Sequence, residues 1–125
     1  MAIALHIDEP AELDLIIERD TTPKLQFEIF EDEAQTIAID VDDFTFEAYI
    51  KGDFNTTNAG AAMSWADGDI TKKPDAQGNV IQIPISLSES NDSDQLLNNG
   101  VFLLYMTDSS GHRERIAKGE IQARS

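Results

Sequence analysis

The segment LLNNGVFLLYMTDSSGHRERIAKGEIQARS, residues 96–125, decides the fold. It contains an apolar run with hydrophobic residues on both faces, then the turn sequence DSSGH, then a second stretch of strand-forming residues. Gly111 can adopt the positive φ that a tight turn requires. The segment therefore predicts a β-hairpin, and its first strand is expected to lie centrally in a sheet because both of its faces are apolar.

Alternation of apolar and polar residues with a period of two continues through the rest of the chain. It is clear in KLQFEIF (24–30), DFTFEAYI (43–50) and NVIQIPISL (79–87), and LDLIIERD (13–20) and TIAID (36–40) also suit strands. In the 79–87 stretch the residues expected to face the core are Ile81, Ile83, Ile85 and Leu87.

Two details of these strands need a local explanation. Pro84 has no N–H to donate, so its strand is expected at an edge or with that position turned outward. Ile116 and Ile121 are five residues apart and cannot share a face of a regular strand, so we expect a β-bulge near Gly119.

The segment SESNDSDQLLNNG (88–100) departs from period two and has helix-capping residues at both ends. The whole pattern predicts an all-β fold, an immunoglobulin-like antiparallel β-sandwich of about 7–9 strands, with one short helical crossing near residues 90–98. A small barrel is the alternative. Residues 1–125 are expected to form a single domain, in which residues 1–12 are either an exchanged N-terminal arm or a plain first strand.

Composition sets the broad class of the protein. The chain has 125 residues, 41% of them hydrophobic, which suits one domain with its own core. It has no cysteine, which excludes disulfides and thiolate metal sites. The opening MAIALHIDEP lacks the basic region of a signal peptide, and no apolar run reaches the roughly 18–20 residues of a membrane helix.

Charge restricts the partners. The net charge of −15 would repel nucleic acid and anionic membranes, so we expect neither as a partner. Residues 1–112 carry 22 acids and 5 bases, whereas residues 113–125 carry 2 acids and 4 bases. This contrast favours a last strand that lies beside acidic strands of its own sheet. The alternative is a partner interface in which the basic segment of one copy meets an acidic face of another. The four basic residues are Arg113, Arg115, Lys118 and Arg124.

No motif for catalysis is present. His6 and His112 are far apart in the sequence, the serines lack a nucleophile-elbow context, and the glycines form no phosphate-binding loop. We therefore expect a protein that is not an enzyme and needs no cofactor. Two alternatives remain open: calcium binding by ADGDITKKPDAQGN (66–79), which lacks the EF-hand spacing, and sugar binding through an exposed Trp65, although a lone tryptophan in a small sandwich is more often a core residue.

Over about residues 13–124, in the stretches 15–52 and 96–123 and the edge strand between them, the chain resembles small immunoglobulin-like proteins of tailed bacteriophages, including the amino-terminal module of baseplate upper proteins. The chain departs from that pattern at EDEAQTIAI (31–39), where a glycine-containing turn is usual. The residues that carry the resemblance are the corner Arg19-Asp20-Thr21, then Gly100, Val101, Phe102, Tyr105, Asp108, Gly111, Ile116, Gly119 and Ile121.

The resemblance implies a non-enzymatic structural component of a phage virion. It would be a tail, baseplate or fibre-attachment protein that assembles with other virion proteins and with copies of itself as a homo-oligomer. A head-surface or decoration protein is the alternative within the same class.

Overall fold

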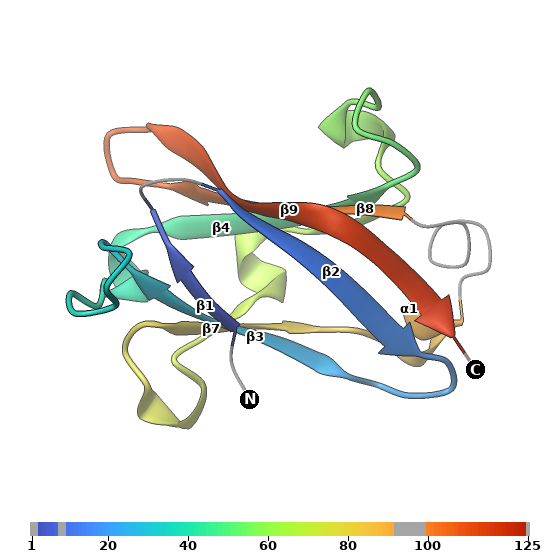
Figure 1. Cartoon of the computed structure of the whole chain (residues 1–125), viewed down its shortest axis with the longest axis horizontal. Helices are drawn as coiled ribbons and strands as arrows, with labels where there is room; N and C mark the ends of the chain where they lie inside the picture. Colours follow the sequence, from blue (N-terminus) through green and yellow to red (C-terminus); the bar gives the residue numbers. More distant parts are fainter. Residues whose placement is uncertain (1–2, 8–9, 92–99, 125) are drawn as a thin grey trace.

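The computed structural model describes residues 3–7, 10–91 and 100–124. Over these residues the chain is an all-β sandwich of two sheets with one short α-helix and four single-turn 3-10 helices, which confirms the predicted fold class (Figure 1). The strands are β1 (Ile3–His6), β2 (Ala11–Glu18), β3 (Lys24–Phe30), β4 (Thr45–Lys51), β5 (Met63–Trp65), β6 (Thr71–Lys72), β7 (Val80–Pro84), β8 (Gly100–Thr107) and β9 (Arg113–Arg124), and the helix is α1 (Leu87–Ser90).

The two sheets have the strand orders β1-β3-β7-β6 and β2-β9-β8-β4-β5. All ladders are antiparallel except two: β1 runs parallel to β3, and β2 runs parallel to β9. The β2–β9 ladder pairs residues 11–18 with residues 117–124 in unbroken register. The last strand is therefore an interior strand, held between β2 and β8 (Figure 1).

The core lies between the sheets and is built from the alternation that the sequence shows. Phe27 of β3 and Phe102 of β8 are fully buried, and their rings stack with centroids 5.9 Å apart, one ring from each sheet. Phe46 of β4 is fully buried between the same layers. Burial of a phenylalanine side chain contributes about 1.5–3 kcal/mol, so this aromatic cluster is a main source of cohesion between the sheets.

β8 is central, as expected, and is buried on both faces. Phe102 and Leu104 face the core, while Val101 and Leu103 point to the other side and are buried too. The segment after β4, residues 52–62, rises above this side of the five-stranded sheet (Figure 1). Lys51 holds that segment in place, because its ammonium group donates to the Thr56 carbonyl oxygen at 2.8 Å.

The bulge in the last hairpin is not at the predicted position. The register between β8 and β9 shifts at Leu104 and Tyr105, which pair with Ala117 and Arg115. Ile116 is the extra residue, so the bulge that brings Ile116 and Ile121 into the core lies at Ile116 and not near Gly119.

Two further strand predictions are corrected. The stretch 36–40 forms only a single bridge, Phe30 to Ala38, because the Asp32 carboxylate accepts the Thr36 and Ile37 N–H groups and folds the segment into a turn. Leu87 is exposed and begins α1, because the Ser86 side chain caps that helix.

Pro84 is exposed at the end of β7, which agrees with the predicted outward position.

β7 is an interior strand, but its partner β6 is only two residues long and reaches Ile81 and Gln82. The side of Pro84 that would face β6 therefore has no strand neighbour among the described residues, and its missing N–H costs nothing there.

Two predicted features, the helical crossing and the N-terminal arm, lie partly outside the described residues. The helix α1 covers residues 87–90, and the rest of the predicted crossing near residues 90–98 lies largely beyond what is described. Residues 3–6 form β1 in the chain's own four-stranded sheet, with Leu5 buried. An N-terminal arm over residues 1–12 that exchanges between copies stays a prediction. Within the described chain no helix is long and apolar enough to cross a membrane.

Candidate functional site: the outer face of the five-stranded sheet

The four basic residues of the last strand lie on the side of the five-stranded sheet that points away from the core, here called the outer face. β9 has 12 residues, and at about 3.3 Å per residue its ends lie roughly 36 Å apart. The four cations therefore do not form one patch. Arg113 and Arg115 gather at one end, Lys118 lies in the middle, and Arg124 lies at the other end.

Arg113 and Arg115 both contact Tyr105 of β8. The Arg113 guanidinium lies 4.1 Å from the Tyr105 ring centroid and 2.8 Å from the Glu47 carboxylate of β4. The Arg115 guanidinium donates to the Tyr105 hydroxyl at 3.2 Å. Contacts of a guanidinium with an aromatic ring contribute about 0.5–1 kcal/mol at exposed sites, so this end of the outer face is organised within the chain.

The two tyrosines beside these arginines have opposite pKa shifts. Burial raises the pKa of Tyr105, but the hydrogen bond and the charge of Arg115 outweigh it, and the net shift is downward. Burial also raises the pKa of Tyr49, and the hydrogen bond from its hydroxyl to Glu47 at 2.6 Å raises it further. Their rings meet edge to face at 5.9 Å.

Lys118 and Arg124 face the acidic strand β2. The Lys118 ammonium lies 3.7 Å from the Glu12 carboxylate, and Arg124 pairs in register with Glu18. The ladder thus sets opposite charges beside each other, which is the expected arrangement for adjacent strands. The role of all four basic residues as a partner interface stays a prediction.

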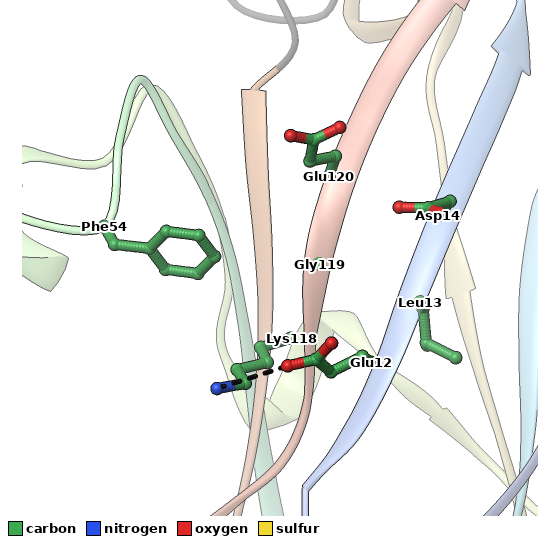
Figure 2. A pocket seen from close by; sticks show the side chains of 7 residues that line it. All are labelled: Glu12, Leu13, Asp14, Phe54, Lys118, Gly119 and Glu120. Atoms are coloured by element: carbon green, nitrogen blue, oxygen red, sulfur yellow. Dashed lines mark ion pairs between the residues drawn. The ribbon is translucent and has the colours of Figure 1, made fainter.

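A groove of about 430 Å³ crosses the outer face between β2 and residue Phe54. Figure 2 shows the Phe54 ring on one side of β9 and Asp14 of β2 on the other, with Glu120 on β9 itself and the Lys118–Glu12 ion pair at one end. The lining is one exposed aromatic ring, three carboxylates and one lysine, contributed by Glu12, Leu13, Asp14, Phe54, Lys118, Gly119 and Glu120.

Two local features shape this groove. At Gly119 the strands approach so closely that an added β-carbon would lie 1.6 Å from the Leu13 carbonyl oxygen. On the other side, Phe54 is 54% exposed at the tip of the 52–62 segment, where the Asp53 carboxylate accepts the Asn55 and Thr56 N–H groups at 2.9 Å. Sequence reasoning missed Phe54; its signal was an aromatic residue inside a turn-rich segment.

The residues of the candidate calcium and sugar sites make hydrogen bonds and ion pairs with other parts of the chain. In the 66–79 loop the Asp67 carboxylate accepts the Phe46 N–H at 2.9 Å and pairs with Lys72, and Asp69 accepts the Ala66 N–H. Trp65 is only 5% exposed, and its indole N–H donates to the Pro84 carbonyl oxygen at 3.1 Å. Its ring is therefore not open for stacking on a sugar.

Metal-ligating side chains do not gather in the described part of the chain, where no group of three or more His, Asp or Glu residues could hold a metal ion. His112 contacts Glu114 through its Nε2 at 2.9 Å at the exposed end of the β8–β9 hairpin. His6 lies in β1 and His112 in the turn between β8 and β9, and neither belongs to a cluster that could bind a metal ion.

Comparison with known proteins supports the fold. No protein-family model matches the chain, and no curated protein matches it in sequence. Among solved structures, the N-terminal domain of phage TP901-1 ORF48 superposes with a TM-score of 0.55 at 8% sequence identity, over 98% of this chain and 96% of that one. The chain therefore shares its sandwich over nearly its whole length with a domain of a phage protein.

Proposed function

We propose that this protein is a non-enzymatic structural component of a tailed-bacteriophage virion. The observation that carries the proposal is the likeness to the N-terminal domain of phage TP901-1 ORF48, which extends over 98% of the chain. Several polar side chains of the described residues are used in the fold itself: Asp67 accepts the Phe46 N–H, Arg113 pairs with Glu47, and Lys118 pairs with Glu12.

Within the virion we propose a position in the tail, the baseplate or the fibre attachment, in contact with other virion proteins and with copies of itself. A compact sandwich can present strand edges and loops to neighbours, and virion parts assemble as symmetric rings or trimers. A head-surface position is the alternative, and copy number separates the two.

The test is quantitative mass spectrometry of phage particles purified from the source system. The proposal expects this chain in the particles, at a small multiple of three or six copies. Hundreds of copies would instead place the chain on the head or along the tail tube. Absence from washed particles, with the protein present in the lysate, would overturn the virion role.

A further inference from the structure

The strand β2 forms an open edge of the sandwich. It is the outermost strand of the five-stranded sheet and pairs only with β9 among the described residues. The other outer strands, β1, β5 and β6, have four, three and two residues, whereas β2 has eight in unbroken register. A long, regular edge strand is a template for pairing with another chain unless it is protected.

The backbone groups that face this open side can be assigned. The Arg19 N–H donates to the Arg124 carbonyl oxygen at 2.9 Å, and the Leu13 carbonyl oxygen points toward Gly119, so odd-numbered residues direct their backbone groups to β9. Backbone groups of successive residues point to opposite edges of a strand. The even-numbered residues of β2 therefore direct their N–H and C=O groups to the open side.

The same even-numbered positions carry acidic side chains on the outer face. Glu12, Asp14 and Glu18 are exposed, and Ile16 between them is 46% exposed. The groove described above continues this acidic surface toward Phe54 through Glu120 (Figure 2). A segment seated at this edge would thus meet carboxylates at alternate positions of β2.

A second copy of β2 does not suit this edge. Antiparallel pairing of two β2 strands about Leu15 would place Glu12 of one copy against Glu18 of the other, between molecules that each carry a net charge of −15.

The chain also has few cations to offer another copy. Lys72, Lys73, Arg113 and Lys118 lie in ion pairs with its own carboxylates, and Lys51 is 4% exposed and bound to a carbonyl oxygen. The exposed cations outside these contacts, Lys24, Arg115 and Arg124, lie on the interior strands β3 and β9. The described part of this chain therefore offers no free strand with cations at alternate positions, and the complementary segment is sought in another protein.

We infer that the open edge of β2 docks an extended segment of a different protein that carries Lys or Arg at alternate positions. Backbone hydrogen bonds to β2 add the segment to the sheet as a further strand. Its basic side chains pair with Glu12, Asp14 and Glu18 on the outer face of β2. Because it names the surface through which the chain would join other virion proteins, this inference rests on the proposed function.

The experiment uses the full chain and a blocked eight-residue peptide of alternating Lys and Val, with a peptide of four Lys followed by four Val as its control. Binding is measured by calorimetry at low salt, and backbone amides are followed by NMR. We expect the alternating peptide to bind about tenfold more tightly than the control peptide, and to protect the amides of Asp14 and Ile16 from hydrogen exchange.

Two variants separate edge pairing from general attraction to an acidic protein. Ile16→Pro removes an N–H on the open side and no bond to β9, so it should weaken binding by about tenfold or more while the thermal melt stays cooperative. Glu12→Gln with Asp14→Asn should weaken binding to a similar extent. The matched control, Glu33→Gln with Asp43→Asn, removes the same charge from exposed positions away from β2 and should bind like the unmodified chain.

Equal binding by folded Ile16→Pro protein, equal loss in the control variant, or no preference for the alternating peptide would overturn the inference. The outcome is distinguishable from failure of the proposed function. If the chain is absent from phage particles but the peptide still protects β2, the virion role fails and the docking edge stands. If the chain is present in particles and the peptide does not protect the β2 amides, only the inference about the docking edge is refuted.

Discussion

The Leu13 carbonyl oxygen occupies the space where a β-carbon at residue 119 would lie, 1.6 Å from its ideal position. Only glycine, which has no side chain, allows β2 and β9 to pair at this register. The contact is made by backbone and not by a flexible side chain, so neither partner can move aside without opening the ladder. Gly119 is thus a condition for the parallel pairing on which the five-stranded sheet depends.

Gly119→Ala should therefore destabilise the protein by at least about 1–3 kcal/mol, the usual cost of overpacking. Urea unfolding followed by circular dichroism measures it. Gly68→Ala is the matched control, because nothing lies within 4 Å of the β-carbon it adds, and it should stay within about 0.5 kcal/mol of the unmodified protein. Equal midpoints for the two variants would contradict the close approach.

Replacing Arg115 with Gln should raise the pKa of Tyr105. The arginine stabilises the phenolate by its charge and by a hydrogen bond. Once it is removed, burial, which favours the neutral form, is opposed only by the smaller effects of Asn58 and Lys51. Absorbance of tyrosinate during an alkaline titration reports the change. Arg124→Gln, on the same strand at its other end, should leave both tyrosine titrations as they were; a shift of equal size there would point to net charge instead.

The carboxylate of Asp108 organises the turn between β8 and β9. It accepts the Ser110 hydroxyl at 2.7 Å and the His112 N–H at 3.0 Å, and these hydrogen bonds hold its pKa below the ordinary value of 3.8. A depressed pKa stabilises the fold above 3.8, and that stabilisation is lost as the pH falls through the lower native value.

Asp108→Asn should consequently show a smaller loss of melting temperature than the unmodified protein when the pH falls from 5 to 2, an interval that spans the ordinary value of about 3.8 for an aspartate. Differential scanning calorimetry at several pH values gives the comparison. Glu33→Gln serves as the control for removal of an exposed acid. Parallel pH profiles for Asp108→Asn and the unmodified protein would refute the assigned role.

Trp65 should behave as a core residue in fluorescence. Because its ring is buried and its N–H is bound to Pro84, we expect blue-shifted emission, weak quenching by acrylamide, and no change when soluble glycans are added. Unfolding in urea should restore acrylamide quenching. This control would show that the weak quenching of the native protein results from burial of the ring. Saturable emission changes with a glycan in the native protein would revive a sugar-binding role.

Sequence periodicity was sufficient to predict the strands that have one face toward the core and one toward solvent. The alternation in β7 correctly placed Ile81 inside, the same alternation in β3 and β4 matches the burial of Phe27 and Phe46, and the two-sided apolar character of β8 correctly made it central. The stretch 36–40 has the same kind of residues, but hydrogen bonds from the Asp32 carboxylate outweigh strand pairing there. Side-chain competition of this kind is not visible in the hydrophobic pattern.

The candidate site was only half visible in the sequence. Charge contrast singled out the basic residues of β9, because four cations close together stand out in an acidic chain. The acidic strand beside them did not stand out, since the chain has 24 acids. That β2 pairs with β9, and in a parallel sense, depends on contacts between residues about a hundred positions apart, which no local pattern encodes.

The parallel β2–β9 ladder also sets the order in which the protein can fold. Ala11 pairs with Ala117, so the five-stranded sheet closes only after a loop of about a hundred residues has been brought together. During synthesis on the ribosome β2 and β8 emerge before β9, the strand that pairs with both of them. We expect slow, late-forming structure and a nascent chain that relies on chaperones until β9 has emerged.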